Sequence, residues 1–184
     1  MYKRQSLAGM SKATVADTIA DQSVQDPIPA QPIDPPTITV TFGINDSPLA
    51  GRDGKKVQSR VIRDRLLKEC ESNVAIKMVD TPGGEAFDVS GRGELQMGVL
   101  IENMRREGFE LSISRPRVIY TDVEGVKNEP LEEVTIDVDE EFSGAVIEKL
   151  STRKGEMVDI KSSGSGKTRI VSLVPSRGLI GYHS

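Results

Sequence analysis

One order of predicted elements occurs twice in this chain, and this repetition constrains the fold more than any other feature. Each copy starts with a strand of alternating apolar residues and continues with an amphipathic helix and two further strands. Each copy then reaches a turn that contains Arg-Gly, at residues 90–95 and again at residues 175–180. Only four residues follow the second turn. The sequence therefore predicts two related units, of which the second is unfinished.

The first unit spans residues 37–120 and has the complete pattern. Its predicted elements are a strand at 38–42, a Gly-rich loop at 43–56, a helix at 57–70, strands at 74–79 and 87–90, a helix from Glu94 to a cap at Gly108, and a strand at 109–114. This βαββαβ order is the split βαβ arrangement of the ferredoxin-like fold. Gly98 lies inside the second helix, where glycine costs about 1 kcal/mol, so we expect a close packing contact there.

The second unit, residues 121–184, begins its first strand near Leu131. A helix that Ser143 can cap follows, and two strands at 157–161 and 168–174 are joined by a Gly/Ser-rich segment. That segment is suggestive of a phosphate-binding loop, but Lys161 stands where the motif needs glycine, so a hairpin is favoured. A sheet that lacks one of its two helices leaves apolar surface exposed to water. Burial of that surface would stabilise the unit by about 25 cal/mol per Å². We therefore expect the second unit to be poorly stable alone.

Residues 1–36 precede both units and carry little pattern. One strand is predicted at 13–20, and five of the ten prolines lie between Pro27 and Pro36, which favours an extended linker.

Composition excludes several classes of site. The single cysteine, Cys70, permits neither a disulfide framework nor a Cys-based zinc site, and the single histidine, His183, lies next to the last residue. A Ser-His-Asp arrangement is therefore not expected, and the acidic run at 129–141 fits no Ca²⁺-loop spacing. No apolar stretch is long enough to span a membrane. The net charge of −4 conceals a basic stretch at 52–69 and another at 149–177.

The two Arg-Gly turns are the better site candidates. Arg92 and Arg177 each lie beside a predicted helix N-terminus, where free N–H groups favour an anion, and arginine suits phosphate geometry. Contact with an RNA backbone is one interpretation. A structural arginine that pairs with a carboxylate is the other. Stacking of bases on the sheet is disfavoured, because the predicted strands lack the required aromatic pattern.

The run Val89–Leu111 closely resembles the TypA/BipA family of ribosome-associated translational GTPases. So do residues 46–54, 132–136 and 171–182, and residues 16–21 resemble the closing strand of that family's domain II barrel. Elongation factor G is a related alternative, but it inserts a large domain where residues 121–130 join the two units here. LepA also lacks that insertion, yet the amino-acid sequence of the motifs is more similar to that of TypA/BipA.

The resemblance implies that residues 1–36 are the tail of a β-barrel domain with its linker. It implies that residues 37–120 are domain III and that residues 121–184 are an incomplete domain V, similar to the C-terminus of elongation factor G. The GTP-binding domain and the family's own C-terminal domain have no counterpart here. No catalytic, cofactor or metal residue is therefore carried over, and GTP and Mg²⁺ are expected only for the full-length protein.

The family hydrolyses GTP on the 70S ribosome and is linked to stress responses and ribosome assembly, in the bacterial cytoplasm or an organellar matrix or stroma. We therefore expect this chain to contact ribosomal RNA and to couple domains, without a membrane partner. Its candidate RNA contacts are Arg52, Lys55, Lys56, Arg92 and Arg177. The alternative is a regulatory module that binds a small ligand between paired ferredoxin-like domains.

Overall fold

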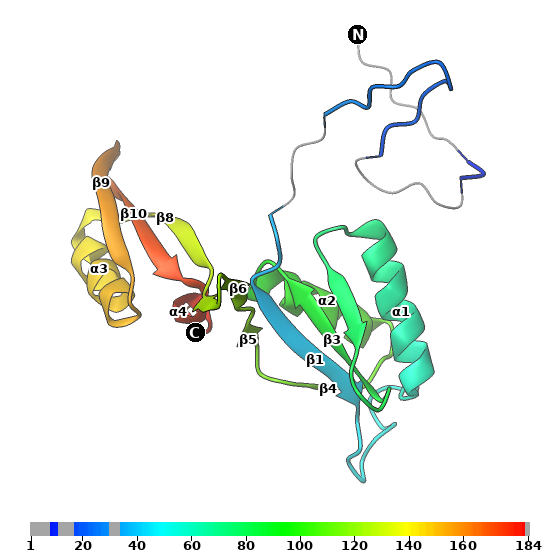
Figure 1. Ribbon diagram of the computed structural model, residues 1–184. Coiled ribbons are helices and arrows are strands. Elements are labelled where there is room, and N and C mark those ends of the chain that lie inside the picture. Colours follow the sequence, from blue (N-terminus) through cyan, green and yellow to red (C-terminus); the bar gives the residue numbers. More distant parts are fainter. Residues whose placement is uncertain (1–7, 11–16, 30–33, 183–184) are drawn as a thin grey trace.

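The structure is a computed structural model that describes residues 8–10, 17–29 and 34–182 (Figure 1). Part of the strand predicted at 13–20 lies outside these residues, and the described part, 17–20, forms no strand.

The first unit is a five-stranded antiparallel sheet with two helices. Its elements are β1 (Ile38–Ile44), α1 (Ser59–Ser72), β2 (Lys77–Asp80), β3 (Ala86–Gly91), α2 (Glu94–Arg106), β4 (Leu111–Ile113) and β5 (Arg117–Val118). The strand order is β2-β3-β1-β4, and β5 pairs with the start of β1. This is the order of a ferredoxin-like sheet, so the predicted fold class is confirmed for this unit.

Both helices cover the same face of this sheet because the strands alternate. Phe42 pairs with Phe87 in the register of β1 and β3, and both side chains are buried beneath α1 and α2. The helices contribute buried residues Ile62, Leu66, Met97, Leu100 and Met104 to this core. The opposite face carries small polar side chains. Among the described residues of β1 and β3 the aromatics lie in the core, so base stacking on this sheet gains no support.

The second unit has three strands and one long helix. Its elements are β8 (Leu131–Asp139), a 3₁₀ turn (Glu140–Phe142), α3 (Ser143–Thr152), β9 (Glu156–Gly164), β10 (Lys167–Pro175) and α4 (Ser176–Leu179). The sheet order is β8-β10-β9, which matches the first three strands of the same topology. Within the described residues, the one-turn α4 stands where the second helix is expected.

The segment at 164–168 is a β-hairpin turn, as the sequence favours. Ser165 and Gly166 both have positive φ, at 53° and 74°, which is typical of a type I′ turn between β9 and β10. A second such turn, at Glu124 and Gly125, joins β6 (Thr121–Val123) to β7 (Val126–Asn128). This hairpin lies between the two units and is absent from the sequence prediction.

Two local predictions are wrong. Ser143 is the first residue of α3 rather than its cap, and its hydroxyl donates to the Glu140 carbonyl at 2.7 Å. A Cβ added at Gly98 would meet no atom within 4 Å, so no close contact explains that glycine in the described structure.

The last described turn connects the two units. Ile180 packs against the core of the first unit, and the Gly181 N–H donates to Glu94 Oε2 at 2.9 Å. Arg153, at the end of α3, fixes this turn by donating to the carbonyls of Gly178, Ile180 and Gly181 at 2.8–3.1 Å. In Figure 1, α4 accordingly lies between the two sheets, close to β8.

Candidate nucleic-acid interface

The loop between β1 and α1 carries three of the five candidate cations and is folded around one carboxylate. Glu110, the residue before β4, accepts from Asn45 Nδ2 at 2.6 Å through Oε1. Its Oε2 accepts from the backbone N–H groups of Gly51 at 2.8 Å and Gly54 at 3.2 Å. Desolvation alone would raise the pKa of Glu110, but these hydrogen bonds together lower it.

The far end of this loop is fixed to the turn between α2 and β4. The Lys56 N–H donates to the Gly108 carbonyl at 3.1 Å, and the Glu110 N–H donates to the Lys56 carbonyl at 3.3 Å. Gly54 is buried there, and a Cβ at this position would lie 2.7 Å from the Gly108 oxygen. Only glycine therefore fits, and the backbone of the loop is held from two sides.

The three loop cations differ in their surroundings. Lys56 Nζ lies 4.6 Å from the centroid of the Phe109 ring, a cation–π distance. Arg52 and Lys55 are exposed, and in the described part of the chain neither makes an ion pair. The loop extends below the first sheet in Figure 1, away from the second sheet. These two cations are accessible to an external anion.

Arg92 is held by a carboxylate from the segment that precedes β1. Its Nη2 lies 2.5 Å from Asp34 Oδ2, and its side chain is 43% exposed. The Arg92 backbone N–H donates to Gln96 Oε1 at 2.8 Å, which satisfies one group at the start of α2. The structure thus gives Arg92 the carboxylate partner that the alternative interpretation requires.

Arg177 has a comparable partner in Glu129. The two charged groups lie 3.0 Å apart, from Nε to Oε2, without the alignment of a hydrogen bond. The arginine side chain is 55% exposed. Its helix, α4, has only four residues, too short to concentrate a helix dipole on an anion. The sequence expectation of a helix N-terminus at this turn is therefore met only by a single turn of helix.

The five candidate residues do not form one cluster. Arg92 lines a cavity at the junction of the units together with Asp34, Pro130, Glu132 and Glu133. Arg177 pairs with Glu129, the residue before Pro130. This junction is rich in carboxylates and is electrostatically less suited to a polyanion than the loop with Arg52 and Lys55.

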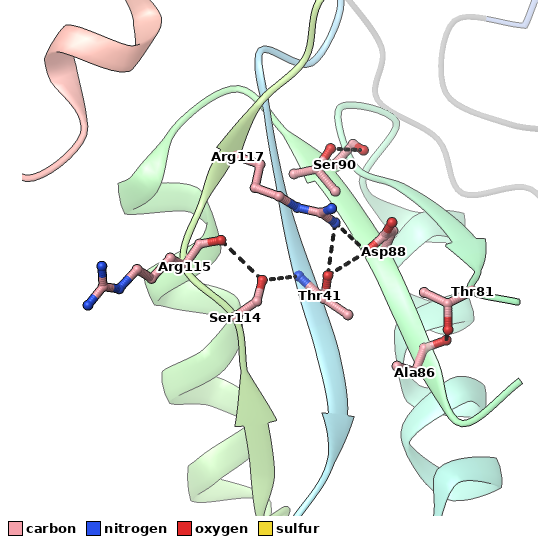
Figure 2. Close-up of polar contacts among 9 residues, drawn as sticks. Thr41, Thr81, Ala86, Asp88, Ser90, Ser114, Arg115 and Arg117 are labelled. Atoms are coloured by element: carbon pink, nitrogen blue, oxygen red, sulfur yellow. Dashed lines mark hydrogen bonds and ion pairs between the residues drawn. The ribbon is translucent and has the colours of Figure 1, made fainter. Parts of the chain in front are cut away.

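The open face of the first sheet carries a polar network that the sequence did not reveal (Figure 2). Arg117 Nη2 donates to Thr41 Oγ1 and to Asp88 Oδ1, both at 3.0 Å, and the Thr41 hydroxyl donates to the same Asp88 oxygen at 2.6 Å. Arg115 points away from this group in the same view. The one sign of this network in the sequence is the pair of arginines around Pro116, shortly after β4.

Two further classes of site find no support in the described residues. No group of three or more His, Cys, Asp or Glu side chains there could hold a metal ion. The helices described are all too short or too polar to cross a bilayer.

Comparison with known proteins agrees with the architecture. Residues 126–184 match the family model of the elongation factor G C-terminus. The chain is 50% identical over 177 residues to the large ribosomal subunit assembly factor BipA of Haemophilus influenzae, across 96% of this chain and 29% of that protein. It is 48% identical to the same factor of Bacillus subtilis over 96% of this chain, and 47% identical to that of Salmonella typhimurium over 97%. Over nearly all of its length, the sequence is similar to BipA.

The BipA relatives extend well beyond the region shared with this chain. The chain spans 29% of the Bacillus subtilis protein and 30% of the Salmonella typhimurium protein. Both ferredoxin-like units lie inside the matched region, because the matches cover nearly all of the chain. The resemblance read from the sequence motifs is therefore confirmed at the level of the family.

Proposed function

We propose that this chain is the part of a BipA-type translational GTPase that contacts ribosomal RNA and couples neighbouring domains. Residues 37–120 would be domain III, residues 121–184 part of domain V, and residues 1–36 the end of a preceding barrel with its linker. The match of residues 126–184 to the elongation factor G C-terminus supports the second assignment. The relatives' name as large ribosomal subunit assembly factors supports the ribosome as partner.

In this proposal GTP hydrolysis belongs to the full-length protein, which would bind GTP and Mg²⁺ in another domain and act on the 70S ribosome in the bacterial cytoplasm. Stress responses and ribosome assembly would be the processes it serves. The present residues would supply contact and coupling, so we expect this chain alone to hydrolyse no GTP.

The observation that carries the proposal is the loop with Arg52 and Lys55. Its backbone is held from two sides, while both cations are exposed and, among the described residues, lack carboxylate partners. Cations on an ordered backbone neutralise phosphates without first ordering a loop. Lys56 contributes charge beside Phe109. Arg92 and Arg177, which are paired with carboxylates, would act chiefly in coupling.

Binding to purified 70S ribosomes, measured by sedimentation over a range of salt concentrations, tests this role. We expect the double variant Arg52→Ala, Lys55→Ala to bind about fivefold to tenfold more weakly near 0.1 M salt. Its plot of log affinity against log salt should be shallower by about 1.5, because each lost phosphate contact removes about 0.7–0.9 from the slope.

The matched control is Lys127→Ala, Lys167→Ala, which removes the same charge from two exposed positions outside the loop. This control should bind nearly as tightly as the parent chain. Equal losses in the two double variants would mean that only total charge matters, and the proposed contact would be abandoned.

A further inference from the structure

Glu110 is a carboxylate placed beside a basic loop, yet its oxygens bind backbone and amide donors rather than cations. Asn45, Gly51 and Gly54 supply these donors at 2.6, 2.8 and 3.2 Å. All three belong to the β1–α1 loop, whereas Glu110 directly precedes β4. One side chain therefore ties the start and the middle of the β1–α1 connection to the edge of the sheet.

The loop depends on this acceptor because the hydrogen bonds that residues 46–50 make are local. The Ser47 N–H donates to Asn45 Oδ1 at 3.0 Å, and the Leu49 N–H donates to Ser47 Oγ at 3.2 Å. Gly51 has a φ of +85°, a conformation available mainly to glycine, and the Gly51 N–H needs an acceptor once the chain turns there. The Ala50 N–H donates to the Ser47 carbonyl at 2.9 Å, which forms one local turn but fixes nothing to the sheet. Without the Glu110 carboxylate, the Gly51 and Gly54 N–H groups lose their acceptor.

Arg52 lies between these two anchored glycines, and Lys55 follows directly after Gly54. The backbone at both cations is thus fixed by Glu110, although the carboxylate forms no ion pair with either. Two opposite effects on a polyanion follow. The negative charge of Glu110 repels phosphate, while its hydrogen bonds hold the cations in one arrangement and reduce the ordering that binding would otherwise require.

We infer that Glu110 is a positioning residue for phosphate recognition, whose carboxylate pre-forms the loop that presents Arg52 and Lys55 to an RNA backbone. This inference rests on the proposed function. It gives an acidic residue a favourable role in binding a polyanion, which charge alone would not predict.

The direction in which Glu110→Gln changes the affinity for ribosomes distinguishes the two effects. Glu110→Gln removes a negative charge and places an NH₂ group against N–H donors. Positioning predicts that binding to purified 70S ribosomes weakens by about fivefold, and that the amides of Gly51 and Gly54 exchange hydrogen faster by at least tenfold. Simple charge repulsion predicts tighter binding instead.

Asp46→Asn is the matched control, because Asp46 is exposed in the same loop and its carboxylate accepts no hydrogen bond within the described residues. It should bind ribosomes as tightly as the parent chain or slightly more tightly. Glu110→Asp provides a second variant that keeps the charge and shortens the reach, so it should weaken binding in the same direction as Glu110→Gln. Unchanged exchange in β1 and β3 shows that each variant is folded.

Binding by Glu110→Gln that equals or exceeds that of Asp46→Asn overturns the inference. Weaker binding with unchanged Gly51 and Gly54 exchange overturns it as well, because the loop would then not be what Glu110 controls. Failure of the proposed function is a separate result, in which Arg52→Ala, Lys55→Ala leaves ribosome binding intact whatever the exchange data show.

Discussion

Two glycines in this chain occur for different structural reasons, and only the atoms around each one show which reason applies. Gly54 is buried against the α2–β4 turn, where a side chain would collide with the Gly108 carbonyl. Gly98 lies on the exposed side of α2, with open space around its missing side chain. The sequence pattern correctly places Gly54 in a loop and Gly98 in a helix, but it carries no information on which atoms face them.

Gly98→Ala should therefore stabilise the chain. Alanine is favoured over glycine inside a helix by about 0.8–1 kcal/mol, and no atom opposes the added methyl group. Urea denaturation of the two proteins measures the change in the free energy of unfolding. Gly54→Ala should destabilise in the same assay, because a Cβ there would lie 2.7 Å from a backbone oxygen. A destabilising Gly98→Ala would show that some group does pack at this site in solution.

Arg65 and Glu107 give the first unit a pH-dependent contact between its helices. Arg65 donates to Glu107 through Nε and Nη2 at 2.8 and 2.9 Å, and this hydrogen-bonded pairing lowers the pKa of Glu107 below its usual 4.5. A lowered pKa in the folded state means that the stabilisation is present above about pH 4.5 and is lost as the pH falls through the folded-state value.

Glu107→Gln should thus destabilise the chain more at pH 7 than at pH 3, because the stabilisation from the parent carboxylate is lost as the pH falls through its lowered pKa. Urea midpoints at the two pH values provide the measurement. Asp64→Asn, on the exposed side of α1, is the control for the loss of one carboxylate, because Asp64 makes no ion pair within the described residues. A constant difference between Glu107→Gln and the parent at both pH values would contradict the assigned cause.

At the level of elements, alternation and helical spacing identify the strands and helices that bury apolar residues. β1, β3, α1 and α2 are predicted within a few residues because each has one buried face. β5, β6 and β7 are two or three residues long and carry no alternation, so pairing with a neighbour, rather than local pattern, creates them.

The candidate site likewise has a part that local sequence predicts and a part that depends on the folded structure. The sequence alone proposes the loop cations and both turn arginines as candidates, since residue type and position are local properties. It cannot identify Asp34, Glu129 or Glu110 as their partners or supports. Asp34 is 58 residues from Arg92, and Glu110 is 59 residues from Gly51, so only the folded sheet brings them together.

Across the whole molecule, buried apolar residues are unevenly distributed. In the described chain after Glu129, the fully buried hydrophobic side chains are Leu150, Ile170 and Val174, and all others belong to the first unit. On β8, Val134, Ile136 and Val138 are only half-buried, because α3 lies over β9 and β10. The second unit thus has less hydrophobic stabilisation for its size.

Native-state hydrogen exchange should reveal this difference. We expect the amides of β8 and β10 to exchange through lower-energy openings than those of β1 and β3, by about 2 kcal/mol or more. The core amides of β1 serve as the internal reference. Equal protection in both sheets would mean that the exposed face of β8 is covered in solution.

The hydrogen bond from Gly181 to Glu94 has a mechanical consequence. Glu94 is the first residue of α2, which also begins two residues after Arg92. If the second sheet swings about the β6–β7 hairpin, it must either release that carboxylate and lift Ile180 off the neighbouring core, or pull on the opening turn of α2. The contact of Gly181 and Ile180 with the first unit therefore couples the two sheets mechanically, and a force on the second sheet is transmitted to the first at the start of α2.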